Sequence, residues 1–173
     1  MGRGLPEALM DQALRDELYQ AYVGEAKAAL RLYLFAEKAQ DEGYPQIAHL
    51  FRVVAESEKI HGKRVLRLLR EIGGTEANLK SAFESEVQVA GIAYDRMIKL
   101  ATELNDAPTL TILNNSHDVE NIHAKLYKEA MNHMMEERET IYYVCDVCGY
   151  VSDGVRPEVC PVCGAKPEHF YKY

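Results

Sequence analysis

Residues 51–72, FRVVAESEKIHGKRVLRLLREI, carry apolar side chains at the spacing of an amphipathic helix. Two polar residues, Glu58 and His61, fall on the stripe that should face the core. They stand three residues apart, so a carboxylate and an imidazole can converge on one ion from one helical face. A carboxylate buried without a partner is costly, and such groups are normally paired or bound to a cation. This segment therefore predicts a core helix that binds a metal.

The same motif returns later in the chain as Glu120-Asn121-Ile122-His123. Each Glu-x-x-His is preceded, at nearly the same distance, by a lone glutamate on a predicted inner stripe. Two equivalent halves, each with one lone glutamate and one Glu-x-x-His, predict a site for two metal ions. Imidazole and carboxylate suit iron, manganese or zinc, so the ligand types alone do not choose the metal. The predicted ligands are Glu25, Glu58, His61, Glu86, Glu120 and His123.

Amphipathic segments of helical length fill most of the chain, and turn residues such as Gly, Pro and Asn separate them. Four such helices joined by short turns predict an all-α four-helix bundle whose apolar faces meet. The helical period ends at Thr140, and the stretch from Ile141 to Val144 predicts a short strand. We therefore expect a bundle domain over residues 1–140 and a small β/loop domain over residues 141–173. The predicted helices are 12–41, 45–72, 79–104 and 109–139.

All four cysteines lie in the C-terminal segment as two C-x-x-C pairs, each followed by glycine. The segment is too short to bury a sufficient core of its own, so it needs disulfides or a bound metal ion to stay folded. One tetrahedral site of four thiolates meets that need. Disulfides are one alternative, disfavoured in a reducing compartment. Structural zinc is the other, because zinc and iron accept the same four thiolates. The predicted ligands are Cys145, Cys148, Cys160 and Cys163.

The acidic composition limits the partners. The chain has 20 Lys and Arg against 27 Asp and Glu, a formal net charge of -7. Such a charge disfavours nucleic acid or an anionic membrane as the main partner. No basic segment followed by an apolar one opens the sequence, and no apolar run approaches the length that spans a bilayer. We expect a cytoplasmic protein that binds neither nucleic acid nor membrane.

Beyond the ligands, the chain resembles the rubrerythrins from about Leu14 to Phe170. The resemblance implies a ferritin-like di-iron bundle followed by a rubredoxin-like domain in which four cysteines hold one iron. It implies that the protein reduces hydrogen peroxide to water with electrons from a donor protein such as a rubredoxin or its reductase. It also favours iron over zinc at the four cysteines. The similar stretches include Phe35-Ala36-Glu37-Lys38-Ala39, Glu42-Gly43-Tyr44, Asn78-Leu79-Lys80, Cys148-Gly149-Tyr150 and Cys160-Pro161-Val162-Cys163-Gly164-Ala165.

Two positions depart from the family pattern. Rubrerythrins usually carry a further glutamate three residues after the position of Glu86, and here that residue is Val89. They also carry a tyrosine seven residues after the position of Glu25, and here it is Leu32. In the family the extra glutamate exchanges with the histidine at the position of His61 as the iron changes oxidation state. Because Val89 cannot exchange, His61 is expected to be a permanent ligand, which leaves a six-ligand site like that of bacterioferritins and ferritins.

Three other residues are considered for roles near the predicted site. Tyr94 keeps the position of a second family tyrosine, and we expect it to take part in catalysis. Tyr22 is expected either to pack in the core or to hydrogen bond to the metal site. His117 stands three residues before Glu120 but has no carboxylate partner at ligand spacing. Two other functions stay open, namely an O2-reducing oxidase or ferroxidase, and a non-enzymatic metal-binding protein with structural zinc at the cysteines.

The connection between the second and third predicted helices is short for a bundle of this class, which usually has a long crossover there. About five residues, 73–77, join helices of roughly 40 Å, at about 1.5 Å per residue. Either the four helices of one chain form a bundle with up-down-up-down topology, or the first helical hairpin of one chain packs on the second hairpin of another chain. We expect the second arrangement, a domain-swapped homodimer. A dimer would also let one chain's cysteine domain reach the other chain's di-iron site.

Overall fold

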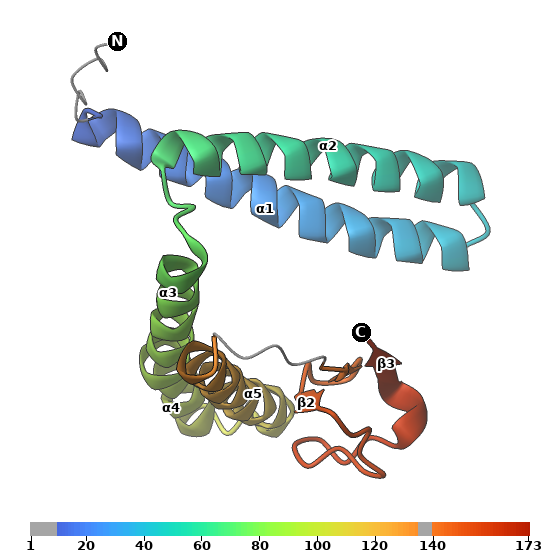
Figure 1. Cartoon of the computed structure of the whole chain (residues 1–173). Helices are drawn as coiled ribbons and strands as arrows, with labels where there is room; N and C mark the ends of the chain where they lie inside the picture. Colours follow the sequence, from blue (N-terminus) through green and yellow to red (C-terminus); the bar gives the residue numbers. More distant parts are fainter. Residues whose placement is uncertain (1–9, 135–139) are drawn as a thin grey trace. The chain divides into compact units, whose positions relative to one another are not determined.

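The computed structural model describes residues 10–134 and 140–173 (Figure 1). The chain forms two compact units, and the division between them falls at Gly73 and Gly74. We call them the N-terminal unit and the C-terminal unit. Helices dominate both, and a small strand region follows at the C-terminus, so the predicted fold class is confirmed. The predicted domain boundary at residue 140 stays a prediction, and residues 135–139 lie outside the described part.

The N-terminal unit is a helical hairpin of α1 (Gln12–Asp41) and α2 (Pro45–Leu69). Asp11 caps the first helix, and its side chain accepts hydrogen bonds from the backbone N–H groups of Ala13 and Leu14. The proline at the start of α2 has no N–H to leave unpaired there. The hairpin turn therefore falls where the sequence predicts it.

The second helix ends before Ile72, which had been predicted as its last residue. Arg70 adopts a left-handed conformation with φ 57°, which terminates the helix. The Arg15 guanidinium of α1 donates to the Leu69 carbonyl over 2.9 Å and pairs with Glu71 at 3.0 Å. Two contacts from the partner helix thus fix the point at which the chain leaves the hairpin.

Small side chains form the seam between α1 and α2. On α2 the buried positions recur at every seventh residue, the repeat that keeps one seam facing a partner helix. A Cβ atom built on Gly62 would lie 3.6 Å from the Cβ of Glu25, so the seam runs directly beside this glutamate. The buried seam residues are Ala29, Ala36, Ala39, Ala48, Ala55, Gly62 and Leu69.

Larger apolar side chains of the hairpin remain exposed within its own unit. Leu30 and Leu34 on α1, and Val53 and Ile60 on α2, are each more than half exposed. Burial of such side chains is the main favourable contribution to folding and association. The hairpin therefore offers apolar surface for another part of a protein assembly to cover.

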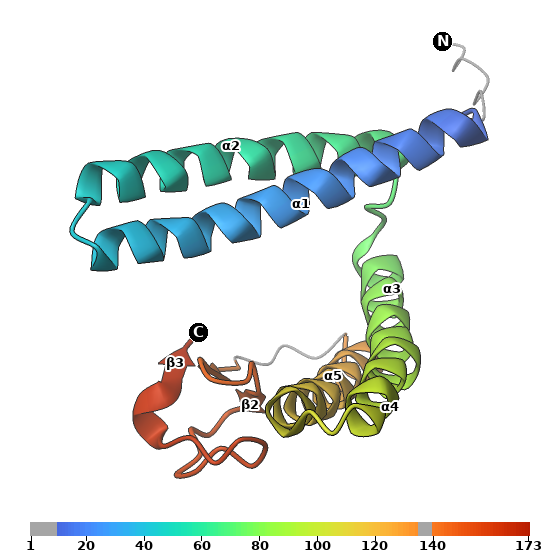
Figure 2. The ribbon, with the colours of Figure 1, turned by 180° about the vertical axis from the view of Figure 1, so that it is seen from behind.

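The C-terminal unit begins with a helical rod made of three parts, seen from behind in Figure 2. These are α3 (Thr75–Gln88), a π-helical segment η1 (Val89–Tyr94) and α4 (Asp95–Glu103). The sequence had predicted a single helix over 79–104, and the backbone dihedrals at both junctions are helical, so the rod is continuous. The π segment was not predicted. It begins at Val89, which is the position that departs from the family pattern.

The rod packs against α5 (Ala107–Asn132). The Asp106 side chain caps this helix by accepting a 3.2 Å hydrogen bond from the Thr109 backbone N–H. The observed helix starts slightly before the predicted Thr109. It ends at Asn132, whereas the prediction ran to Glu139, a residue outside the described part.

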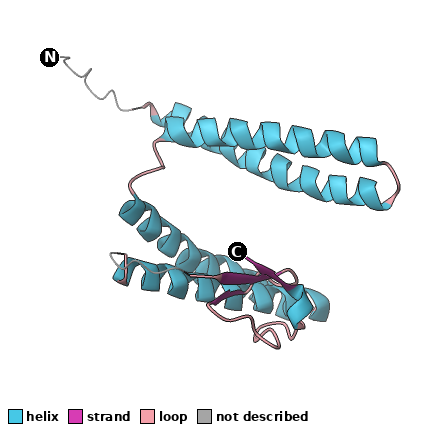
Figure 3. Cartoon of the chain, turned by 45° about the vertical axis from the view of Figure 1, so that its right-hand side comes forward, coloured by secondary structure: helices cyan, strands magenta, loops and turns pink. Residues whose placement is uncertain are grey.

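A three-stranded antiparallel sheet forms the rest of the unit (Figure 3). Its strands are β1 (Tyr142–Cys145), β2 (Val151–Asp153) and β3 (Phe170–Lys172), in the order β2-β1-β3. A short 3-10 helix, η2 (Pro167–His169), precedes the last strand. Cys145, Cys160 and Phe170 are the buried residues of its core. The strand predicted over 141–144 is thus present, one residue further along the chain.

Candidate metal sites

The N-terminal unit brings together Glu25 of α1 with Glu58 and His61 of α2. Their ligand atoms all lie within 4.8 Å of one another. The His61 Nδ1 lies 3.0 Å from Glu58 Oε2 and 3.8 Å from Glu25 Oε1. We call these three residues the N-terminal triad. Glu58 and His61 lie on one face of α2 because they are three residues apart, and the close packing of α1 on α2 brings Glu25 beside them.

The C-terminal unit repeats this geometry with Glu86 of α3 and with Glu120 and His123 of α5. The His123 Nδ1 lies 3.1 Å from Glu120 Oε2 and 3.8 Å from Glu86 Oε1. We call these residues the C-terminal triad. Its histidine is less exposed than that of the N-terminal triad, at 26% against 48%.

Crowding of the carboxylates is visible in their pKa values. Burial, the hydrogen bond to Glu120 and the Glu120 charge raise the pKa of Glu86 to about 6. The hydrogen bond with Glu58, burial and the Glu58 charge raise the pKa of Glu25. A cation between the two carboxylates of a triad would remove this repulsion and favour both ionised forms. Each triad thus has the donors and the charge of half a di-metal site.

The two triads belong to different units, so their union in one site stays a prediction. Neither His117 nor Tyr22 is a member of a triad, although Tyr22 lies near Glu25, since a Cβ atom built on Gly62 would lie 3.9 Å from the Tyr22 ring and 3.6 Å from the Glu25 Cβ. His117 contacts Asp95 at 3.8 Å and Asp118 at 3.3 Å. Tyr22 packs 6.1 Å from the Tyr19 ring, centroid to centroid, on α1.

A cavity of about 460 Å³ opens beside the C-terminal triad. Glu86 and His123 form part of its lining, and Tyr127 of α5 and Tyr142 of β1 complete the polar part of the wall. The sequence had not singled out either tyrosine. Tyr127 follows His123 by one helical turn, a spacing that could have indicated it, whereas nothing in the sequence places Tyr142 there.

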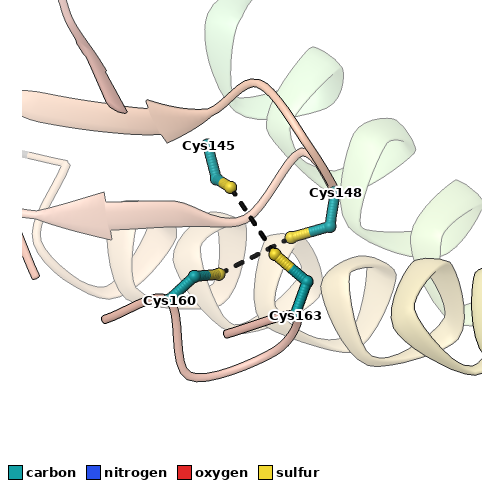
Figure 4. Close-up of side chains that lie close together, drawn as sticks. All are labelled: Cys145, Cys148, Cys160 and Cys163. Carbon is teal, nitrogen blue, oxygen red and sulfur yellow. Dashed lines mark hydrogen bonds between the residues drawn. The ribbon is translucent and has the colours of Figure 1, made fainter. Parts of the chain in front are cut away.

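The four cysteines form one cluster of sulfur atoms (Figure 4). The Sγ atoms of Cys145 and Cys163 are 3.8 Å apart, and those of Cys148 and Cys160 are 3.6 Å apart. All four are free thiols, so the disulfide alternative finds no support. A tetrahedron with metal–sulfur bonds of about 2.3 Å has edges of about 3.8 Å, which fits these separations.

Backbone N–H groups surround the cluster in two turns of the same build. Gly149 donates to the Cys145 carbonyl and Gly164 to the Cys160 carbonyl, each over 2.9 Å, and both glycines have positive φ. Burial raises the pKa of the Cys148 thiol. Burial acts in the same direction on Cys160, but hydrogen bonds from backbone N–H groups outweigh it and lower its pKa. A bound cation favours all four thiolates.

Two carboxylate–histidine triads on helices, followed by a four-sulfur cluster in a small sheet domain, define a ferritin-like metalloprotein with a rubredoxin-like domain. The profile of the family described as Rubrerythrin matches residues 16–131, and the profile described as Rubrerythrin, rubredoxin-like domain matches residues 143–171. The chain belongs to the rubrerythrin family.

Relatives match over nearly their whole length. Rubrerythrin-2 of Clostridium acetobutylicum is 29% identical, with 91% of this chain and 95% of that protein covered. Rubrerythrin of Porphyromonas gingivalis is 30% identical, with 90% and 86% covered. The structure of partially reduced nigerythrin matches with a TM-score of 0.57 and 25% identity over 97% of this chain and 90% of that chain.

The family and the donor sets together define the cofactors. They are two iron ions in a carboxylate-bridged site and one iron in a rubredoxin-like tetracysteine site. Members of the family are oxidoreductases. Within the described residues, no helix is both long and apolar enough to cross a membrane.

Proposed function

We propose that this protein reduces hydrogen peroxide to water at its di-iron site, with electrons relayed through the tetracysteine iron. The observation that carries the proposal is the presence in one chain of two carboxylate–histidine triads and a closed four-sulfur cluster. A site closed by four thiolates has no open position for substrate, so its role is relay. The reaction consumes two electrons and two protons and gives two waters from one peroxide. The di-iron centre, when bound, supplies the two electrons.

We assign a different role at this site to each group of side chains. Glu58 and Glu120 are proposed to hold both ions, and each is the carboxylate closest to the histidine of its own triad, at 3.0 and 3.1 Å. His61 and His123 would each bind one ion, and the carboxylates could shift their coordination without leaving. Tyr94, at the end of the π segment, is proposed to hydrogen bond at the site.

Stopped-flow mixing of the fully reduced protein with peroxide and with O2 tests this function. The expected result is faster oxidation by peroxide. Oxidation no faster with peroxide than with O2 would refute the peroxidase, and turnover with iron uptake would favour a ferroxidase. Metal analysis and a visible spectrum test the other alternative, a non-enzymatic protein with structural zinc at the cysteines. A colourless protein that contains only zinc would refute the redox function.

Val89 favours the second candidate, an O2-reducing oxidase or ferroxidase. No further carboxylate joins either triad among the described residues, so each triad has three ligands. Without a glutamate to exchange, His61 is proposed to stay bound in both oxidation states. That would give a six-ligand site closer to those of bacterioferritins and ferritins.

Val89→Glu is expected to raise the ratio of the peroxide rate to the O2 rate by roughly 10-fold, the scale on which groups around a metal tune activity. The new carboxylate would stand one turn after Glu86 on the same rod, at the position where the family has the glutamate that exchanges with the histidine at the position of His61. Stopped-flow oxidation measures both rates. Val87→Glu is the matched control. Val87 is 49% exposed, and its replacement adds the same charge to the same rod. An equal effect of both variants would contradict this role of Val89.

We also propose a domain-swapped homodimer, in which the exposed apolar surface of one chain's hairpin is covered by the partner's second hairpin. The short connection after Leu69 and the exposed side chains of the hairpin support it. A folded monomer with a loaded di-iron site at low concentration would refute it. The electron donor is proposed to be a protein such as a rubredoxin or its reductase, and the compartment the cytoplasm.

A further inference from the structure

The helical hairpin of the N-terminal unit has a second apolar face, opposite the face that carries its metal ligands. Leu34 follows Glu25 by nine residues, which at about 100° per residue places it about 180° away around α1. Ile60 follows Glu58 by two residues and lies about 160° away around α2. We call this second surface the outer face. Its apolar side chains, each between 53% and 66% exposed, are Leu30, Leu34, Val53 and Ile60.

A polar network joins the two helices at the centre of the outer face. The Tyr33 hydroxyl of α1 donates to the Glu56 carboxylate of α2. The Lys59 Nζ lies 2.9 Å from the same carboxylate and 3.3 Å from the Tyr33 oxygen. The two leucines of the outer face flank Tyr33 on α1, and its two α2 residues flank Glu56. The apolar side chains of both helices therefore belong to one continuous surface.

Completion of the di-metal site leaves the outer face uncovered. A second hairpin that brings the C-terminal triad to the N-terminal triad must pack on the face that carries the metal ligands. The exposed side chains of Phe35 and Leu50 lie toward that face, each about 80° from the triad glutamate of its own helix. The apolar side chains of the outer face point away from it, whichever chain supplies the second hairpin. Another contact is needed to bury them.

Charges beside the outer face fit a second copy of the same face. Glu37 follows Tyr33 by one turn and Arg52 precedes Glu56 by one turn, so they lie at one level of the hairpin, on different helices. Both are exposed, and neither forms an ion pair with another described residue. A two-fold axis parallel to the helices places α1 of one copy on α2 of the other. Glu37 of each copy then meets Arg52 of the other, and the leucines of each copy meet the apolar α2 residues of the other.

We propose that the outer face is an isologous interface between two copies of this chain. The apolar side chains form its centre, and the Glu37–Arg52 pair occurs twice at its rim. Two helices side by side present a face about 40 Å long and about 20 Å wide, so each copy offers about 800 Å², the area of a stable interface. This contact is separate from the exchange of hairpins. It joins two complete bundles, whether each bundle contains one chain or parts of two.

The first test measures the mass of the whole iron-loaded protein by sedimentation. Leu30→Glu and Leu34→Glu should each halve the mass of the wild-type assembly, because a carboxylate would be buried at the apolar centre of the contact. Leu104→Glu is the matched control, since Leu104 is 70% exposed and lies outside the outer face. It should keep the wild-type mass, and circular dichroism should show unchanged helix content in all three variants. An unchanged mass in both outer-face variants, or an equal loss in the control, would overturn the proposal.

The second test exchanges the two charges. Glu37→Arg and Arg52→Glu should each raise the dissociation constant of this contact at least about 10-fold, because like charges then face each other. The double variant should regain the wild-type constant. Because these two side chains do not pair within one chain, such a recovery reports a contact between copies. A double variant that dissociates as readily as the single variants would contradict the two-fold arrangement.

The third test identifies the occupant of the face directly. Arg52→Lys keeps the charge and supplies an amine that a carbodiimide can couple to the Glu37 carboxylate. In protein assembled from equal amounts of isotope-labelled and unlabelled chains, the coupled peptides should include pairs with one labelled and one unlabelled member. Coupled peptides from single chains only, or none at all, would show that a second copy does not occupy the outer face. None of these tests depends on the reaction with peroxide.

Discussion

Cys160→Ser is expected to abolish turnover with an electron donor while the di-iron site still reacts once with peroxide. Cys160 is buried, and its Sγ lies 3.6 Å from that of Cys148 in the cluster. Burial acts to raise the pKa of its thiol, but hydrogen bonds from backbone N–H groups and neighbouring cysteines outweigh burial and lower the pKa, which favours the thiolate that binds metal. Serine has a much less acidic hydroxyl and leaves three thiolates. The variant should lose the tetracysteine iron, as iron analysis and loss of its visible absorption would report.

Loss of the tetracysteine iron should also unfold the small cysteine domain. Its buried core consists of two of the cysteines and Phe170, too little to keep a sheet of this size folded without its metal. The control separates folding from relay. Wild-type protein with zinc at the cysteines should keep the domain folded yet show the same loss of donor-dependent turnover. Full turnover of either protein would contradict the relay.

The fold was predictable where local chemistry determines it. The first hairpin turn follows from Gly43 and Pro45, and both helix ends there match the prediction. The end of α2 was predicted too late, because the apolar stripe continues to Ile72. What ends the helix is the left-handed Arg70 and the long-range hydrogen bond from Arg15, and neither leaves a signal in the local pattern.

The π segment shows a second limit of periodicity. Val89–Tyr94 keeps apolar residues at spacings that fit an ordinary α-helix, and small residues such as Ala90 and Gly91 fit either form. Only the shifted hydrogen-bond ladder distinguishes the two forms. The shift rotates the residues that follow, so the face on which Tyr94 lies could not be predicted from its distance to Glu86.

The members of each triad were predictable because charged residues on apolar stripes are unusual and the motif occurs twice. The packing of strand β2 against α5 was not predictable, because nothing in the local sequence of either element indicates the other. His169 is a similar case. Its Nδ1 lies 2.9 Å from Asp146, a partner that no motif spacing indicates.

Glu120→Gln is expected to lower the affinity of the bundle for iron by more than about 100-fold, because even partners outside the ligand shell typically affect affinity by about 10- to 100-fold. The amide keeps the shape of the side chain but loses the charge. Glu120 lies beside both Glu86 and His123, with its Oε2 3.1 Å from the His123 Nδ1, and it is one of the two carboxylates proposed to hold both ions. Titration of the metal-free protein with Fe(II), without oxygen, measures the affinity.

Asp118→Asn is the matched control, because it removes one carboxylate charge from the same helix at an exposed position. It should leave iron affinity near that of the wild type, which would show that ligation rather than net charge is responsible. The neighbouring glutamate gives a second readout. Burial is the first cause of the raised pKa of Glu86, and the hydrogen bond and charge of Glu120 add to it. In metal-free Glu120→Gln, the pKa of Glu86 should therefore move down from about 6 but remain above its ordinary value. Wild-type iron affinity in the variant would exclude Glu120 as a ligand.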